Sequence, residues 1–236
     1  MTVGRRVGIL GGTFDPIHCG HLDVGAAAHA ALDLTEVLVL PSYIPPHRPQ
    51  TAASSYHRFA MVAMAIAGRR GWRALDLELR EPARSYTSDT LRRFHGEGFS
   101  AAELFFIIGA DAFADIATWK DYPGLLDLAH FAVVSRPRGA VADLPARLPS
   151  LASRMHTPNA SARASRRTLI FLIDRPTSDV SSTAIRQAKA RGESIAGLVT
   201  PDVQQHIEQH ALYQQTTPAA EPGAESMNRA AGRLHG

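Results

Sequence analysis

Short apolar runs alternate with alanine-rich or amphipathic stretches along most of this chain. The apolar runs are continuous, which is typical of strands that are buried on both faces of a parallel sheet. The predicted strands are RVGILG (6–11), EVLVLP (36–41), RALDLEL (73–79), ELFFIIG (103–109), HFAVVSR (130–136) and TLIFLID (168–174). The predicted helices are 19–32, 55–69, 87–95, 182–191 and 201–212. This alternation predicts an α/β fold, a Rossmann-like, doubly wound, mostly parallel sheet in a single domain with C-terminal helices.

Two regions depart from this pattern. Residues 137–167 carry six arginines and one aspartate, and apolar residues within 144–155 recur at helical spacing. We expect a basic insert there with one short amphipathic helix, limited by Pro149, and otherwise a partly flexible loop. From residue 214 the chain is rich in Ala, Pro, Glu and Gly and has no periodicity, which predicts a disordered tail. We therefore assign the domain to residues 1–213 and the tail to 214–236.

Composition narrows the function classes. The net charge of the 236 residues is only +3, and no basic stripe with interleaved aromatic residues occurs. An anionic small ligand fits this balance, and we expect no nucleic-acid partner. No run of about 18 apolar residues exists, so we expect no membrane span. The single cysteine, Cys19, excludes a disulfide within the chain and favours a cytoplasmic location. A homo-oligomer is compatible with the sequence.

The stretch GILGGTFDPIHCGHL (8–22) is the first candidate for chemistry. A strand that runs through glycines into a helix leaves the first helical N–H groups free to bind an anion. Gly11 and Gly12 would let the backbone approach a phosphate, and His18 and His21 lie three residues apart, on one face of the first helical turn. A phosphate cradle, a metal site and an ordinary strand-to-helix turn all remain open for this stretch alone.

A metal site would need more ligands than this stretch offers. Zinc usually takes three or four His, Cys or carboxylate ligands, and only Asp15 and Cys19 are near. Cys19 itself is either a nucleophile or a small residue at a helix start, and the second interpretation is favoured. Other phosphate motifs are absent: no G-x-x-x-x-G-K-[ST] occurs. The GEGFSA of 96–101 follows a helix, the reverse of the dinucleotide-binding context.

A second phosphate-type element lies far downstream, in DVSSTAIR (179–186). Ser181, Ser182 and Thr183 supply hydroxyls at a predicted helix start, and Arg186 lies one turn further and offers a bidentate guanidinium. Helix capping alone would also explain the serines. Two helix starts with phosphate-type donors nevertheless suggest that a nucleoside triphosphate is held between them.

The two phosphate-type segments together resemble the motifs of a known group of enzymes. GGTFDPIHCGH together with SSTAIR resembles the nucleotidyltransferases that share the H-x-G-H and S-S/T-x-x-x-R motifs. Within that group the chain is similar to the bacterial nicotinate mononucleotide adenylyltransferases. The further matching blocks are PSYIPPHR (41–48), SYTSDTL (85–91), GADAFADIATWKDYPGLL (109–126) and VSRP (134–137). Arg48 replaces a common lysine and Val180 a common isoleucine, while the insert and the tail match nothing.

The resemblance implies a reaction in which ATP and nicotinate mononucleotide give nicotinate adenine dinucleotide and pyrophosphate, with Mg²⁺ as cofactor. It implies catalytic roles for His18, His21 and Arg186. It implies an ATP site made of Gly11, Gly12, Thr13, Phe14, His18, His21, Gly109, Asp111, Arg136, Ser182, Thr183 and Arg186. It implies a mononucleotide site made of His47, Arg48, Thr87 and Trp119.

Several of these residues have a plainer interpretation. Trp119 is also compatible with a half-buried core indole, and Asp111 with the N-cap of a helix that begins at 112. Arg136 is also compatible with a solvated loop, and His47 and Arg48 with an exposed one.

Three other functions stay open at this point. A sister adenylyltransferase would use nicotinamide mononucleotide or phosphopantetheine. A class I aminoacyl-tRNA synthetase fragment would share the H-x-G-H motif, but it would need a K-M-S-K-S-type loop and an RNA-binding domain, and neither is visible. A non-catalytic nucleotide-binding module would keep the glycines without needing both histidines and Arg186.

Overall fold

The computed structural model describes residues 5–44, 50–80, 82–137 and 139–214. Its strands form one sheet in the order β3-β2-β1-β4-β5-β7-β6, and every neighbouring pair is parallel. The strands are β1 (Val7–Gly12), β2 (Glu36–Pro41), β3 (Trp72–Ala74), β4 (Leu104–Gly109), β5 (His130–Val134), β6 (Met155–His156) and β7 (Ile170–Ile173). The predicted α/β class with a parallel sheet is confirmed.

Helices cover both faces of this sheet. They are α1 (Cys19–Leu32), α2 (Ser55–Ala65), α3 (Thr87–Gly96), α4 (Ala110–Phe113), α5 (Leu144–Arg147), α6 (Ala160–Arg163), α7 (Ser182–Ala190) and α8 (Pro201–Gln209). The bounds of α1 are those predicted. The helix predicted over 55–69 ends four residues earlier, because the chain turns through Gly68, whose φ is 75°. No helix in the described ranges is long and apolar enough to cross a membrane.

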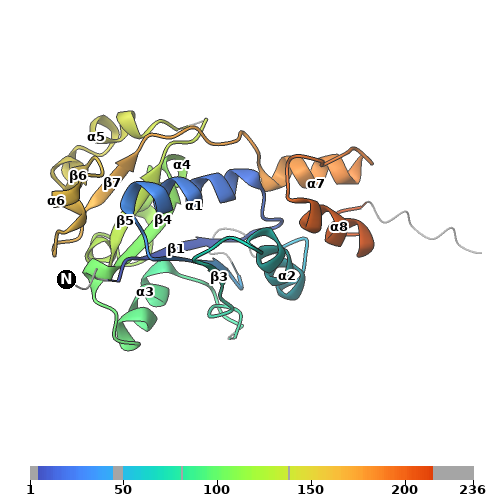
Figure 1. Cartoon of the computed structure of the whole chain (residues 1–236), viewed down its shortest axis with the longest axis horizontal. Helices are drawn as coiled ribbons and strands as arrows, with labels where there is room; N and C mark the ends of the chain where they lie inside the picture. Colours follow the sequence, from blue (N-terminus) through green and yellow to red (C-terminus); the bar gives the residue numbers. More distant parts are fainter. Residues whose placement is uncertain (1–4, 45–49, 81, 138, 215–236) are drawn as a thin grey trace, which may run out of the picture.

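Successive residues of each strand enter two different cores. Phe105 and Ile107 of β4 belong to the core that α1, α2, α7 and α8 cover, whereas Phe106 and Ile108 belong to the core under α3, α4 and α5. Accordingly, α1 and α3 lie on opposite faces of the sheet (Figure 1). This two-sided burial explains why the strands read as continuous apolar runs rather than alternating ones.

The structure corrects two predictions outside the main helices. The strand predicted over 73–79 is cut to Trp72–Ala74, because the chain turns at Asp76, whose carbonyl accepts the Leu79 N–H at 2.8 Å. The insert is not loop apart from one helix. Pro149 splits the expected helix into α5 and a 3₁₀ segment (Pro149–Arg154), and β6 and α6 follow.

Arginines tie this insert to the body of the domain. Arg154 donates from Nη2 to the carbonyl oxygen of Leu126 at 2.6 Å, and Arg163 donates from Nη1 to the carbonyl oxygen of Ala31 at 3.1 Å. Two of the basic residues of the insert therefore hold it against the rest of the domain. The predicted tail lies, except for Gln214, outside the described residues.

The sheet order places a switch point between β1 and β4. From β1 the chain moves to β2 and β3 on one side, and from β4 it moves to β5 and β7 on the other. In open α/β sheets, ligands bind in the crevice outside the carboxyl ends of the strands at such a point. The carboxyl ends of β1, β4 and β5 therefore form the expected ligand-binding edge of the sheet.

Candidate active site

The turn after β1 depends on one glycine. A methyl group on Gly12 would lie 2.9 Å from the ring of Phe14, which is 1% exposed and has a φ of 50°. Only glycine leaves room for that ring. On Gly11 the methyl group would meet Phe106 at an ordinary 3.5 Å. The protein itself therefore does not require glycine at that position, although a closely bound ligand would. Thr13 lies between Gly12 and Phe14 in this turn.

His18 and His21 stand side by side at the start of α1. His18 is the N-cap and His21 the third helical residue, and their rings stack with centroids 3.7 Å apart. The His18 backbone N–H donates to Nδ1 of His21 at 3.3 Å, so a neutral His21 carries its proton on Nε2. The sequence-based expectation that both rings share one face is confirmed in this geometry.

Both histidines are held in the neutral form. Burial, followed by the positive charge of Arg136, lowers the pKa of His18 to about 4. Burial, the neighbouring His18 and Arg136 together hold the pKa of His21 well below its usual range. Each ring therefore offers one N–H donor at neutral pH and no charge. The Nδ1 atom of His18 is buried without a hydrogen-bond partner in the described ranges.

Gly20 lies in a crowded space beside His18, where a side chain would have to displace its neighbours slightly. A methyl group there would lie 3.0 Å from the Ser178 carbonyl oxygen and 3.2 Å from both Arg136 Nη2 and His18 Nδ1. Ser178 is in turn fixed to α1, because its N–H and hydroxyl donate to Asp23 Oδ2 at 2.9 and 2.6 Å. The glycine of the H-x-G-H motif thus lets the segment before α7 and a guanidinium close on the first turn of α1.

Another crowded glycine, Gly109, lets the end of β4 approach the loop after β5. A methyl group on Gly109 would lie 2.6 Å from Arg136 Cδ and 2.6 Å from Asp111 Oδ1. The structure therefore brings these three predicted residues together at the carboxyl ends of β4 and β5. Asp111 is not the N-cap of a helix beginning at 112, because α4 begins at Ala110 and is capped by Gly109. Arg136 is not a free solvated arginine either, since its Nη2 donates to the Val180 carbonyl at 3.4 Å.

The start of α7 packs directly on the turn after β1. Ser181 is the N-cap and accepts the Ala184 N–H at 3.2 Å. The Ser182 hydroxyl donates to the Pro16 carbonyl oxygen at 2.9 Å. Arg186 donates from Nη1 to the Asp15 carbonyl oxygen at 2.7 Å, and its Nη2 lies 3.3 Å from Thr183 Oγ1.

These contacts join two motifs that are far apart in the sequence. The bond between Ser182 and Pro16 spans 166 positions and that between Arg186 and Asp15 spans 171. The N-termini of two helices, α1 and α7, thus meet at the turn after β1, and a helix N-terminus carries partial positive charge.

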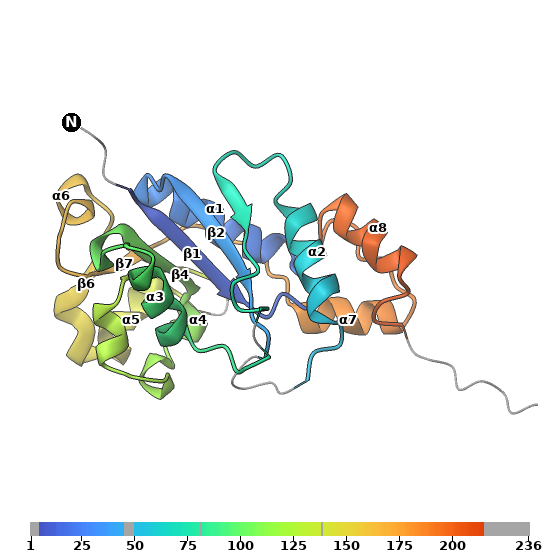
Figure 2. The same ribbon diagram turned by 90° about the horizontal axis from the view of Figure 1, so that it is seen from below.

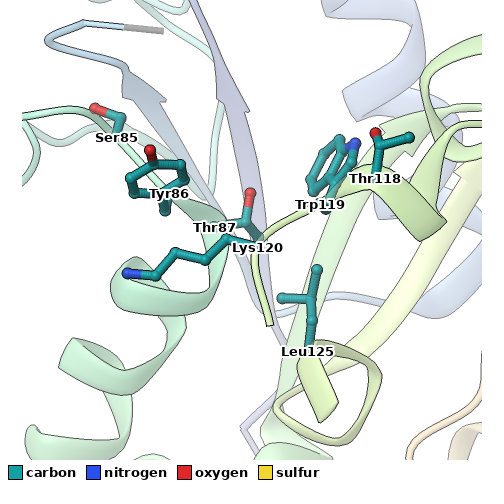
Figure 3. A pocket seen from close by; sticks show the side chains of 7 residues that line it. All are labelled: Ser85, Tyr86, Thr87, Thr118, Trp119, Lys120 and Leu125. Carbon is teal, nitrogen blue, oxygen red and sulfur yellow. The ribbon is translucent and has the colours of Figure 1, made fainter. Parts of the chain in front are cut away.

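A separate cavity of about 130 Å³ lies at the start of α3 (Figure 3). Tyr86 and Thr87 border it on one side and Trp119 on the other, and its lining is completed by Ser85, Thr118, Lys120 and Leu125. The Trp119 indole is half-buried, with its ring centroid 6.1 Å from that of Phe106. The indole is therefore both anchored on the core and open to a ligand, which the two sequence-based interpretations had treated as alternatives.

Comparison with known proteins places this architecture in a family. The profile of the cytidylyltransferase-like family matches residues 9–188. A probable nicotinate-nucleotide adenylyltransferase of Roseiflexus sp. is 40% identical over 212 residues, which cover 88% of this chain and 97% of that protein. One of Geotalea uraniireducens is 37% identical over 212 residues, with 88% and 98% covered.

This chain belongs to the nicotinate-nucleotide adenylyltransferase family. Among solved structures, the Plasmodium falciparum nicotinic acid mononucleotide adenylyltransferase complexed with NaAD matches with a TM-score of 0.67 at 18% identity. That match covers 89% of this chain and 97% of the other, and it supports the fold. The profile of the broader family spans both helix starts and the α3 cavity, and ends before α8.

Two residues of this family member support the site although sequence reasoning did not select them. Asp15 accepts the N–H groups of Ala52 and Ala53 at 2.7 and 3.0 Å and the Tyr213 hydroxyl at 2.8 Å. Its position before a proline in the glycine-rich turn was the available signal.

Arg58 is the second, and it is 1% exposed. Its Nη1 donates to the carbonyl oxygens of Thr13 and Ser42 at 2.8 and 2.6 Å, and its Nη2 donates to that of Tyr43 at 3.1 Å. An arginine inside an otherwise apolar helix pattern was the only hint of this role. Because Tyr43 also donates its N–H to Ser85 Oγ at 2.9 Å, Arg58 links the turn after β1 to the α3 cavity.

Cys19 and the metal-binding interpretation of the two histidines gain no support from the structure. Cys19 Sγ lies 3.5 Å from the Gly197 carbonyl oxygen, and burial raises the pKa of its thiol, which disfavours a nucleophilic role. Within the described part of the chain, His18 and His21 belong to no group of three metal-ligating side chains. His47 and Arg48 lie outside the described residues.

Proposed function

We propose that this protein transfers the adenylyl group of ATP to nicotinate mononucleotide, giving nicotinate adenine dinucleotide and pyrophosphate in NAD biosynthesis. The observation that carries this proposal is the packing of the starts of α1 and α7 around one turn. The bonds from Ser182 to Pro16 and from Arg186 to Asp15 hold two phosphate-type helix starts against one glycine turn. A triphosphate is the ligand class that such a pair of anion sites fits.

The proposed ATP site divides into two parts. Donors from His18, His21, Ser182, Thr183 and Arg186 would receive the phosphates. The backbone of the turn Gly11, Gly12, Thr13 and Phe14 would line their path. Gly109, Asp111 and Arg136, which the structure groups at the ends of β4 and β5, would take the ribose and adenine end.

The chemistry needs donors rather than a base. The nucleophile is the phosphate of the mononucleotide, which is largely a dianion at neutral pH. It attacks the α-phosphorus in line, the bond to the bridging oxygen breaks, and pyrophosphate leaves with that electron pair. Neutral His18 and His21 each donate an N–H to oxygens on which negative charge grows, and Arg186 and Arg136 supply positive charge.

Mg²⁺ fits this site as an ion that is coordinated mainly by the triphosphate. The two carboxylates beside the helix starts are already engaged, since Asp15 accepts from Ala52, Ala53 and Tyr213, and Asp23 from Ser178. Such an ion would therefore take its ligands from phosphates and water, and it would neutralise charge on the leaving pyrophosphate.

We assign the α3 cavity to the pyridine ring of the mononucleotide, with Trp119 as the stacking surface and Thr87 and the N-terminal N–H groups of α3 as donors to the nicotinate carboxylate. None of the described residues that line this cavity is acidic. The ammonium of Lys120 lies 4.8 Å from the Tyr86 ring centroid but is paired with both carboxylate oxygens of Asp89, at 2.9 and 2.8 Å, so its charge is largely balanced. The N-terminal N–H groups of α3 and the Thr87 hydroxyl therefore favour the acid over the amide substrate. His47 and Arg48 are proposed to approach the phosphate of the mononucleotide.

The decisive assay offers nicotinate mononucleotide, nicotinamide mononucleotide and phosphopantetheine in parallel, with ATP and Mg²⁺, and measures pyrophosphate release. We expect nicotinate mononucleotide to give the highest kcat/KM. Preference for another acceptor would identify a sister adenylyltransferase. No pyrophosphate release with any of the three acceptors would refute the proposed adenylyl transfer.

A pair of variants tests the α7 contribution. Arg186→Ala should lower kcat/KM by about 100-fold or more, as expected for loss of a charged donor to the transition state. Arg191→Ala is the matched control, because Arg191 lies at the other end of α7 and pairs with Glu193 at the surface. Equal activity of the two variants would remove Arg186 from the site.

We also propose a cytoplasmic location, which the single cysteine supports.

A further inference from the structure

Three imidazoles converge where α2 meets α8. His57 lies in the first turn of α2, His206 in the last turn of α8, and His210 is the C-cap of α8. Figures 1 and 2 both show these two helices side by side at one end of the molecule. The two α8 histidines are four residues apart and therefore lie on the same helix face, toward α2.

The ligand atoms of this cluster are close enough for one metal ion. His57 Nδ1 and His206 Nε2 lie 3.1 Å apart, and one ligand nitrogen from each of the three rings can be chosen so that all lie within 4.8 Å of one another. With Zn–N bonds of about 2.0–2.1 Å, a tetrahedral ion needs nitrogens about 3.3–3.4 Å apart. Small side-chain rotations, mainly of the exposed His210, would therefore complete the geometry.

The three rings pack against one another, and the His57–His206 contact is within hydrogen-bond distance. All three pairs are in ring contact, with centroids 5.2, 4.8 and 4.4 Å apart. Within the described ranges, none of the three forms an ion pair with an acid. Burial, followed by the neighbouring His210 and His57, lowers the pKa of His206. A neutral imidazole is the form that binds metal.

We propose that His57, His206 and His210 bind one Zn²⁺ ion that links α2 to α8, with water in the fourth position. Three imidazole nitrogens without thiolate or carboxylate suit Zn²⁺ rather than Mg²⁺ or Ca²⁺. His210 is exposed whereas His206 is 7% exposed, so water can reach the cluster from the side of His210.

Such an ion would stabilise the active-site region from outside it. His57 directly precedes Arg58, whose guanidinium holds the Thr13 carbonyl of the glycine turn. The segment after α8 reaches the same region, because Tyr213 donates to Asp15. Fixing α2 to α8 therefore restrains both attachments of the turn.

The experiment uses the full chain without a histidine tag and Zn²⁺ in competition with a chromophoric chelator. We expect one ion per chain, and His210→Ala should weaken binding by at least about 100-fold, the upper end of the cost of losing an outer-shell partner. His57→Ala should do the same. His156→Ala is the matched control, because it removes an exposed imidazole from β6, and it should leave the affinity unchanged.

Two further readouts keep the proposal falsifiable. Co²⁺ in place of Zn²⁺ should give an intense tetrahedral absorption band that is lost in His210→Ala. Zn²⁺ at about 100 times its Kd should raise Tm by about 5–10 °C in the wild type and not in that variant. Binding that persists in His210→Ala and His57→Ala, or that is lost instead in His21→Ala, would overturn the proposal, as would the absence of stoichiometric binding.

Discussion

Replacing the buried Arg58 by methionine is the perturbation that best tests how the turn after β1 is held. The methionine keeps much of the apolar stem but removes three donated hydrogen bonds, to the carbonyl oxygens of Thr13, Ser42 and Tyr43. Arg58 is 1% exposed, so water cannot readily replace those donors. The variant leaves buried acceptors without their partner, and each such group costs about 1–3 kcal/mol.

The expected loss of stability follows from these numbers. Three acceptors would cost about 3–9 kcal/mol, and release from the desolvation of a buried charge offsets part of this. We expect a net loss of about 3–5 kcal/mol in the free energy of unfolding. In a domain of this size, about 2–4 °C of Tm accompanies each kcal/mol. The Tm should therefore fall by about 6–20 °C.

The assay combines thermal or urea unfolding with steady-state kinetics at a temperature where the variant is folded. Because Thr13 belongs to the proposed ATP site, we also expect kcat/KM for ATP to fall by about tenfold or more. Arg80→Met is the matched control, since Arg80 is exposed, pairs with Asp76 at 2.9 Å, and should change stability by no more than about 0.5 kcal/mol. A Tm of Arg58→Met within about 2 °C of the wild type would refute the reasoning.

Three further predictions concern the site itself. Gly20→Ala should leave Tm within about 5 °C, because better helix propensity offsets the crowding. It should lower kcat/KM about tenfold by moving His18 and Arg136, and unchanged kinetics would contradict the crowding argument. Trp119→Ala should raise KM for the mononucleotide more than KM for ATP, and equal effects would favour a purely structural indole. The pKa of His18 is about 4 when folded and 6.5 when unfolded, so the unfolded chain binds more protons between these values. The free energy of unfolding should fall by up to about 3 kcal/mol as pH drops from 6.5 to 4, and urea titrations of His18→Gln should show a shallower fall if this is correct.

Local pattern was sufficient for much of the architecture. The bounds of α1 and β2, and the start of α7, could be read from apolar runs, glycines and capping serines, because these signals act within a few residues. The sequence by itself also placed His18 and His21 on one face, since their spacing of three is a helical neighbour distance.

What only the tertiary structure decided are the contacts between distant segments. Arg58 meets Thr13 across 45 positions, and His57 meets His206 across 149. The helical spacing of Arg58 from Met61, Val62 and Ala65 places it on the buried face of α2, but nothing local shows which carbonyl groups it meets there. Those contacts depend on which elements the order of the sheet brings together, and pairing between distant segments leaves no periodic trace in the sequence.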